Sequence, residues 1–293
     1  MTDKFEIVGI RPAPLSTAKK HSPLAGKPIA ASVILALIML ACLFAEAVMT
    51  KDPTYMELQS CAVAPCREYL FGTDTMGRDI FSMIWYGGRV SLFIGLVSTL
   101  ISTVVAVIFG AVSGTAPEWL DTLLMRATEI FLSVPGLLLV VLLQAILGKP
   151  GALSIALVIG LTGWTGIAKV VRTEVRRLRH SEYIIAAKCM GGGFIHNLIR
   201  HLAPNFFSSI MFMVVMNVRS AIVAESTLSF MGIGLPLEVI SWGSMLSLAE
   251  KALMTDAWWI IVIPGAFLIV TLLCITEIGN FLQARSDSSR SNL

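Results

Sequence analysis

Six long apolar runs constrain the fold of this chain more than any other feature of its sequence. They lie at roughly 29–49, 89–113, 124–147, 152–171, 206–230 and 257–282, and a helix needs about 20 mostly apolar residues to cross the hydrocarbon of a bilayer. Charged residues make up only 14% of the chain, against about 25% in a soluble domain. The sequence therefore predicts an all-α polytopic membrane protein with six transmembrane helices.

Lysine and arginine are distributed unevenly over the segments that flank these runs. They gather before the first run and between the fourth and fifth runs, whereas the segments after runs one, three and five are poorer in them for their length. Because cytoplasmic loops carry the excess of positive charge, both termini and the loop at 172–205 are expected in the cytoplasm. Residues 1–28 and 283–293 are then cytoplasmic tails, and residues 50–87 form an external loop.

The start of the chain allows a second interpretation, a signal peptide with a cleavage site at Ala45-Glu46-Ala47. The apolar stretch before that site exceeds the usual 7–15 residues, and the polar segment that leads it is long. Residues 29–49 are therefore predicted to stay in place as the first transmembrane helix.

The external loop carries an expected interfacial helix and two cysteines. Apolar side chains recur at helical spacing from Ile80 to Trp85, Asp74 is expected to cap this helix, and Trp85 suits the level of the lipid headgroups. Four residues separate Cys61 from Cys66, and an oxidising compartment permits a disulfide between them. The sequence alone leaves open whether that bond forms.

A polar stretch at 181–205 lies between runs four and five. Two short helical patterns flank a glycine break at 191–193, where glycine supplies the backbone freedom to end one helix and turn into the next. Ala186 and Ala187 are small enough to let another protein surface approach closely, and Pro204 opens the fifth run.

This stretch resembles the cytoplasmic coupling loop of ABC-importer permeases, whose pattern is Glu-Ala-Ala, three residues, Gly, and then Ile-x-Leu-Pro. The alanines, Gly191 and Pro204 match that pattern in register, while Ile185 stands where the family has Glu and Ala203 where it has Leu. The resemblance implies ATPase-coupling residues at Glu182, Tyr183, Ala186, Ala187, Gly191 and Pro204.

Three further motifs resemble the dipeptide, oligopeptide and nickel permease subfamily. They are Gly-Thr-Asp-x-x-Gly-Arg-Asp at 72–79 with Gly-Arg-Val-Ser-Leu at 88–92, Leu-Ser-Phe-Met-Gly-Ile-Gly at 228–234 with Ser-Trp-Gly at 241–243, and Trp-Trp at 258–259 with Pro-Gly at 264–265. The resemblance implies the type I ABC-importer permease fold in the bacterial cytoplasmic (inner) membrane, with residues 88–282 as its core. It also implies a homologous second permease, two ATPase subunits and an external solute-binding protein, with short peptides or nickel and other metal chelates as substrate.

The chain itself lacks the Gly-x-x-x-x-Gly-Lys-Ser/Thr loop that cradles nucleotide phosphates. We expect no catalytic residue, metal ligand, cofactor or nucleic-acid partner in it, with ATP and magnesium bound by the ATPase subunits. The alternative function is a secondary transporter driven by an ion gradient. That class usually shows internal repeats and midplane carboxylates, and no convincing repeat occurs in this sequence.

Ionisable side chains inside the apolar runs need a partner or water. Arg126 and Glu129 are three residues apart and share one helix face, which predicts an ion pair between them. Arg219 and Glu225 are six apart and are not expected to pair. Arg219 and Glu225 are both expected to face either the translocation path or the partner permease, and Glu225 is expected at the outer rim of the span. Pro135 can kink the third run.

Overall fold

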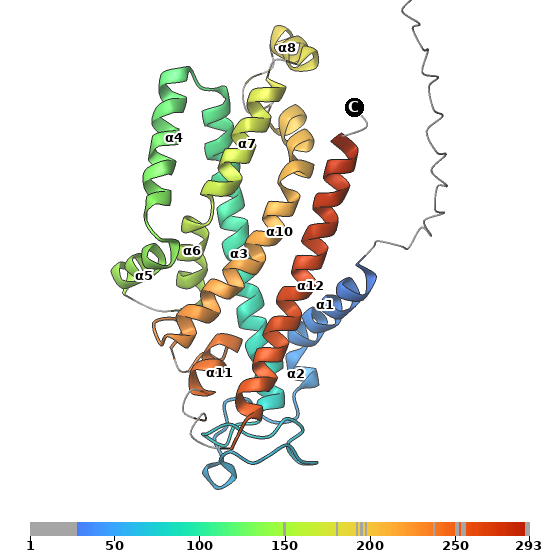
Figure 1. Ribbon diagram of the computed structural model, residues 1–293, viewed down its shortest axis with the longest axis vertical. Coiled ribbons are helices and arrows are strands. Elements are labelled where there is room, and N and C mark those ends of the chain that lie inside the picture. Colours follow the sequence, from blue (N-terminus) through green and yellow to red (C-terminus); the bar gives the residue numbers. More distant parts are fainter. Residues whose placement is uncertain are drawn as a thin grey trace, which may run out of the picture.

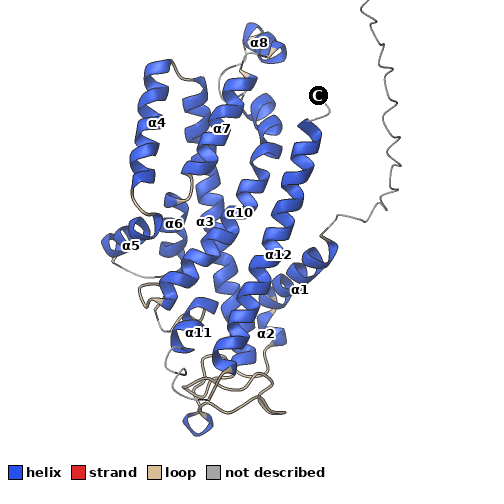
Figure 2. Ribbon diagram, in the orientation of Figure 1, coloured by secondary structure: helices blue, strands red, loops and turns tan. Residues whose placement is uncertain are grey.

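The computed structural model describes residues 28–148, 151–179, 181–191, 193, 196, 198–236, 238–249, 252 and 256–290. These residues form helices joined by loops and turns, and no strand occurs among them (Figure 2). Figure 1 shows the elements in chain order, which are α1 (Ile29–Leu43), α2 (Ala45–Val48), η1 (Leu58–Ser60), α3 (Ile80–Thr115), α4 (Glu118–Ser133), α5 (Gly136–Leu147), α6 (Ala152–Thr162), α7 (Thr165–Leu178), α8 (Glu182–Cys189), the π-helix η2 (Leu198–Leu202), α10 (Ala203–Phe230), α11 (Trp242–Ala249) and α12 (Trp259–Arg290).

Three helical segments are long and apolar enough to cross a membrane singly, namely Ile80–Thr115, Phe206–Phe230 and Trp259–Arg285. Two bent pairs, α4 with α5 and α6 with α7, reach that length together, so the described residues contain three to five candidate spans. The expected first transmembrane helix appears as α1, a shorter apolar helix of 15 residues. The predicted polytopic α-helical architecture is thus observed, and the count of six stays a prediction.

The predicted kink at Pro135 is a full break, at which α4 and α5 meet at 90°. α4 ends at Ser133, Val134 is extended with φ −87° and ψ 129°, and Pro135 precedes the first residue of α5. A residue that precedes proline avoids the helical region because its backbone clashes with the proline ring. The run at 124–147 is therefore two helices in different directions instead of one straight span.

α3 runs along the middle of the molecule, and α6, α7 and α10 pack against it (Figure 1). A small residue permits the closest approach, since a Cβ added to Gly110 of α3 would lie 2.6 Å from the carbonyl oxygen of Ala168 in α7. Three clusters of buried apolar side chains each include residues of α3, and they also contain Trp242, Val171 and Ile159 respectively. The outward faces carry exposed leucine, isoleucine and valine side chains, as expected for helices that meet lipid.

The external loop forms the end of the molecule opposite α8 (Figure 1). Asp79 caps α3 by accepting a hydrogen bond from the Ser82 N–H at 3.1 Å, so the expected cap at Asp74 is wrong. Asp74 instead forms a buried ion pair with Arg78, with 2.7 Å between Oδ2 and Nη2. The Gly-Thr-Asp motif therefore builds a tight turn that leads into the cap, and the cap lies one turn later than expected.

Both cysteines of this loop are free thiols, so the structure does not contain the disulfide considered from their spacing. The Cys61 thiol donates to the Leu58 carbonyl with 3.3 Å between Sγ and O. The Tyr69 N–H donates to Cys66 Sγ at 3.4 Å. Each sulfur therefore forms a hydrogen bond with a backbone group three residues away, and both side chains are exposed.

Candidate coupling site and transmembrane cavity

α8 lies at the end of the molecule at which α12 also ends (Figure 1). Glu182 begins the helix, where a carboxylate is favoured by the positive end of the helix dipole. Gly191 follows the helix with φ +87°, and a Cβ placed there would meet nothing within 4 Å. The predicted need for glycine at this turn is confirmed, and its cause is backbone conformation instead of crowding.

The two faces of α8 differ sharply in exposure. Ile184 is 1% exposed and packs in the apolar cluster of Val171, and Ala187 is 6% exposed on the same side. Glu182, Ile185 and Cys189 are exposed and follow one another at spacings of three and four, which places them on one helix face. Ala187 is thus covered within its own chain, and the ATPase-coupling role expected for it stays a prediction.

For three of the predicted coupling residues the structure describes the backbone alone. Tyr183 and Ala186 lie in the backbone of α8, and Pro204 lies in the first turn of α10, as its predicted place at the start of the fifth run requires. Their side chains lie outside the described residues. Among the α8 side chains that the structure describes, Glu182, Ile185 and Cys189 form the exposed face.

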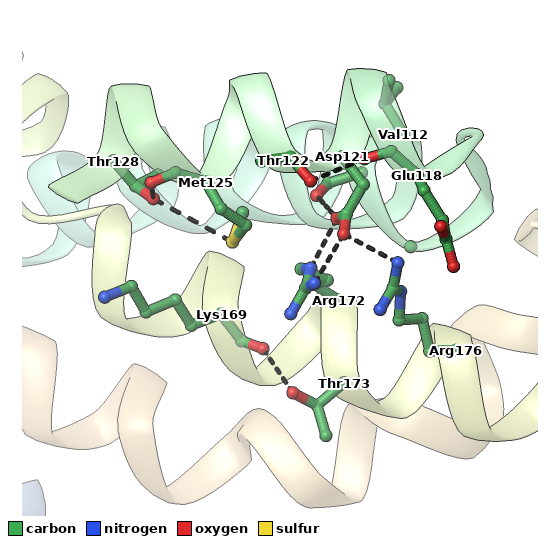
Figure 3. A network of polar contacts seen from close by, with 12 residues as sticks. Val112, Glu118, Asp121, Thr122, Met125, Thr128, Lys169, Arg172, Thr173 and Arg176 are labelled. Carbon is green, nitrogen blue, oxygen red and sulfur yellow. Dashed lines mark hydrogen bonds and ion pairs between the residues drawn. The ribbon is translucent and has the colours of Figure 1, made fainter.

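A buried acid, Asp121, joins α4 to α7 (Figure 3). Asp121 is 3% exposed and accepts hydrogen bonds from Arg172 at 2.5 and 2.6 Å, from Arg176 at 2.7 Å and from the Ser113 hydroxyl at 2.5 Å. The two arginines are four residues apart on one face of α7, so both reach the same carboxylate. α3, α4 and α7 are thereby linked through one side chain.

An open cavity of about 430 Å³ lies between α5, α6 and α10. Arg219 lines it from α10 together with Asn217, while Leu137 of α5 and Thr162 of α6 line the other walls. Arg219 is exposed, and its Nη1 lies 3.4 Å from Thr276 Oγ1 of α12. A guanidinium beside an open, partly polar cavity can attract an anionic group.

Glu225 is completely buried near the end of α10, so it does not reach the surface at the outer rim as expected. The hydroxyls of Ser91, Ser229 and Ser241 donate to its carboxyl oxygens at 3.1, 2.9 and 2.8 Å. The Trp242 N–H in turn donates to the Ser91 hydroxyl at 3.2 Å. Glu225 therefore fastens α10 to α3 and to the start of α11, and it does not contact Arg219.

Arg126 and Glu129 form the predicted ion pair, with 2.8 Å between Nη1 and Oε2. Both side chains are more than half exposed, so the pair contributes little to stability. Sequence reasoning missed Asp121 and the serines around Glu225, since neither set is local in the chain. One signal in the sequence pointed to a distant acid. Arg172 and Arg176 lie four residues apart on one helix face, and no Asp or Glu stands three or four residues from either of them.

Comparison with known proteins agrees with this architecture. The family described as "binding-protein-dependent transport system inner membrane component" matches residues 106–291. The dipeptide transport system permease protein DppC of Bacillus subtilis is 35% identical over 76% of this chain and 69% of its own length. The oligopeptide permease protein OppC of Bacillus subtilis is 34% identical over 87% and 83%, and a putative peptide permease protein of Brucella suis is 32% identical over 87% and 84%.

Several long apolar helices with a short helix at one end fit the membrane-embedded component that this family model describes. The chain belongs to the family of binding-protein-dependent transport system inner membrane components, the permeases of ABC importers. It is accordingly a multi-pass protein of the bacterial inner membrane.

Proposed function

We propose that this chain is one of two homologous permease subunits of an ATP-driven importer of short peptides. Two ATPase subunits bind ATP and magnesium on the cytoplasmic side, and an external solute-binding protein delivers the substrate. The relatives are named as dipeptide, oligopeptide and peptide permeases, which supports short peptides over nickel or other metal chelates. The permease core spans residues 88–282, and the chain itself requires no cofactor.

The observation that carries this proposal is the exposed face of α8. An isoleucine that is 49% exposed sits at its centre, at the end of the molecule where Arg172, Arg176 and Arg177 gather. An exposed apolar side chain among positive charges does not suit lipid, because those charges favour the cytoplasmic surface. It suits a groove on a cytoplasmic protein instead.

The test is recovery of the ATPase subunits with the purified chain. Ile185→Arg places a charge at the centre of the exposed α8 face, so the ATPases should no longer co-purify. Leu58→Arg is the matched control, since Leu58 is 80% exposed in the loop at the opposite end. Equal recovery of the ATPases with both variants would refute docking at α8.

The proposed topology has six transmembrane helices with both termini in the cytoplasm. Native cysteines test it, because Cys61 and Cys66 lie in the external loop and Cys189 lies at the end of α8, all three exposed. A membrane-impermeant maleimide should label Cys61 and Cys66 in intact cells, and Cys189 only after lysis. Labelling of Cys189 from outside would contradict the orientation, and no labelling of any of the three before lysis would do the same.

Arg219 is proposed to serve the translocation path, with the interface to the second permease as the competing role. The cavity it lines supports the first role. Arg219→Leu suits a span, so the chain should still insert. Lost uptake with an intact complex would support the path, lost assembly would support the interface, and normal uptake with normal assembly would exclude both.

A further inference from the structure

Two arginines of α7 and the arginine that follows this helix contact α3 and α4 close to the turn between them. Arg172 and Arg176 bind Asp121 of α4, as Figure 3 shows. Arg179, which follows α7, donates from Nη1 to the Gly114 carbonyl of α3 at 3.2 Å. Their spacings of four and three residues put all three on the same helix face. We call Asp121, Arg172 and Arg176 the Asp121 clamp.

The clamp is buried and directional. The Asp121 side chain is 5% exposed, against 24% for Arg172 and 35% for Arg176. Arg172 uses Nε and Nη2 on the two carboxylate oxygens, the two-point geometry that fixes orientation as well as distance. α4 therefore cannot shift against α7 without breaking several charge-assisted hydrogen bonds at once.

The Asp121 clamp joins α7, the helix that precedes α8, to α4, the helix that precedes α5. α8 follows α7 directly, because the Ser181 N–H donates to the Leu178 carbonyl at 2.9 Å and Ile184 packs in the cluster of Val171 and Val175. α4 leads through Pro135 into α5, whose first turn lines the cavity that contains Arg219. A second connection from α7 to this cavity passes through α6 and a 45° bend at residues 163–164. A third passes through α10, which packs on α7 and also lines the cavity.

We propose that Asp121, Arg172 and Arg176 are positioning residues that make α7 and α4 move as one body, so that movement of α8 reaches the α5 wall of the cavity. This role rests on the proposed function, since it needs an ATPase that moves α8. The exposed pair Arg126–Glu129 lies on the same α4 helix and makes no contact with α7 that the structure shows. It provides a matched control.

The test uses the full complex in liposomes, with the ATPases, the partner permease and the binding protein. Spin labels on Leu123→Cys of α4 and Thr173→Cys of α7, both exposed positions, report the distance between the two helices in a background without native cysteines. With the clamp intact, this distance should be the same in the nucleotide-free and ATP-bound states. In Asp121→Asn it should differ between the two states, while ATP hydrolysis continues.

Transport gives the second readout, with trialanine as the probe. Trialanine imported per ATP hydrolysed should fall about tenfold in Asp121→Asn, within the range typical of a coupling free energy between two sites. Glu129→Gln should leave this ratio unchanged. Arg176→Gln, which keeps the two-point contact of Arg172, should give an intermediate loss if Asp121→Asn fails to assemble.

A purely structural role predicts that destabilised variants lose complex and hydrolysis together, with no nucleotide-dependent change of distance in the complex that remains. That result, or a normal import ratio in Asp121→Asn, overturns the proposal. If the wild-type complex hydrolyses ATP without importing trialanine, the proposed peptide substrate is at fault, and the distance measurement still decides the clamp. If the wild-type chain recovers no ATPase, the proposed function fails and the transmission role falls with it.

Discussion

Replacing Glu225 by alanine should destabilise the external half of the molecule strongly. Three buried hydroxyls, on Ser91, Ser229 and Ser241, donate to its carboxyl group within 3.1 Å. Each would lose its acceptor at a cost of about 1 kcal/mol, or about 3 kcal/mol in all. The missing side chain also leaves a cavity in a fully buried site, which adds roughly 1 kcal/mol.

Glu225→Gln separates the hydrogen bonds from the volume of the side chain. It fills the same space and keeps one oxygen acceptor, so its cost should be only about 1 kcal/mol. A shift of roughly 2 °C in apparent Tm per kcal/mol places the glutamine variant about 2 °C and the alanine variant about 8 °C below wild type. Thr227→Ala on the same helix, whose hydroxyl bonds only to the Val223 carbonyl one turn away, should change the Tm by about 1 °C or less.

The assay follows buried thiols. Cys42 and Cys274 are free and buried, so a thiol-reactive dye detects unfolding when heating exposes them. The exposed cysteines, Cys61, Cys66 and Cys189, are first replaced by serine. An alanine variant within about 2 °C of wild type, or a glutamine variant less stable than the alanine variant, would refute the stabilising role of the Glu225 hydroxyl cluster.

Three further outcomes follow from single contacts. Gly191→Val should place a branched side chain at φ +87°, which costs about 1–2 kcal/mol of backbone strain. The variant should therefore recover less ATPase, and unchanged recovery would show that this turn does not set the orientation of α8. Gly110→Ala should lower the Tm by several °C, because its Cβ would lie 2.6 Å from the Ala168 carbonyl oxygen and overpacking typically costs 1–3 kcal/mol; a Tm equal to wild type would contradict the tight α3–α7 contact. Trp259→Phe should remove the hydrogen bond from Nε1 to the Thr73 carbonyl at 3.2 Å, at a cost of about 1 kcal/mol in stability. Proteolysis within residues 50–79 should become faster, whereas an unchanged digestion rate would show that this bond does not restrain the loop.

Local features of this protein were predictable from its sequence, and features that depend on helix register were not. The Arg126–Glu129 pair, the turn at Gly191 and the break at Pro135 each depend on residues within one helical turn of one another. Spacing and backbone sterics determine such features without knowledge of tertiary packing.

The errors have a common physical origin. Glu225 meets Ser91 and Ser241 from two other elements, and only the packed structure shows that a carboxyl near a span end is enclosed by hydroxyls. Asp121 and Arg172 are 51 residues apart, and their meeting depends on the rotation of α4 against α7. The burial of Ala187 could not be predicted either, because an eight-residue helix gives too short a pattern to show which face is covered.

The packing of α1 has a consequence for biosynthesis. Ile38 and Cys42 of α1 share a buried cluster with Ile260 and Ile275 of α12, the helix at the other end of the described chain (Figure 1). α1 is synthesised long before α12, so its contacts with α12 form late, whereas its contacts with α3 can form earlier. Most of the exposed side chains of α1 are apolar, among them Leu37, which is 61% exposed. They can contact lipid until α12 is made, because lipid tails are as apolar as leucine. The contact between α1 and α12 therefore forms only after the helices that lie between them in the chain have been made.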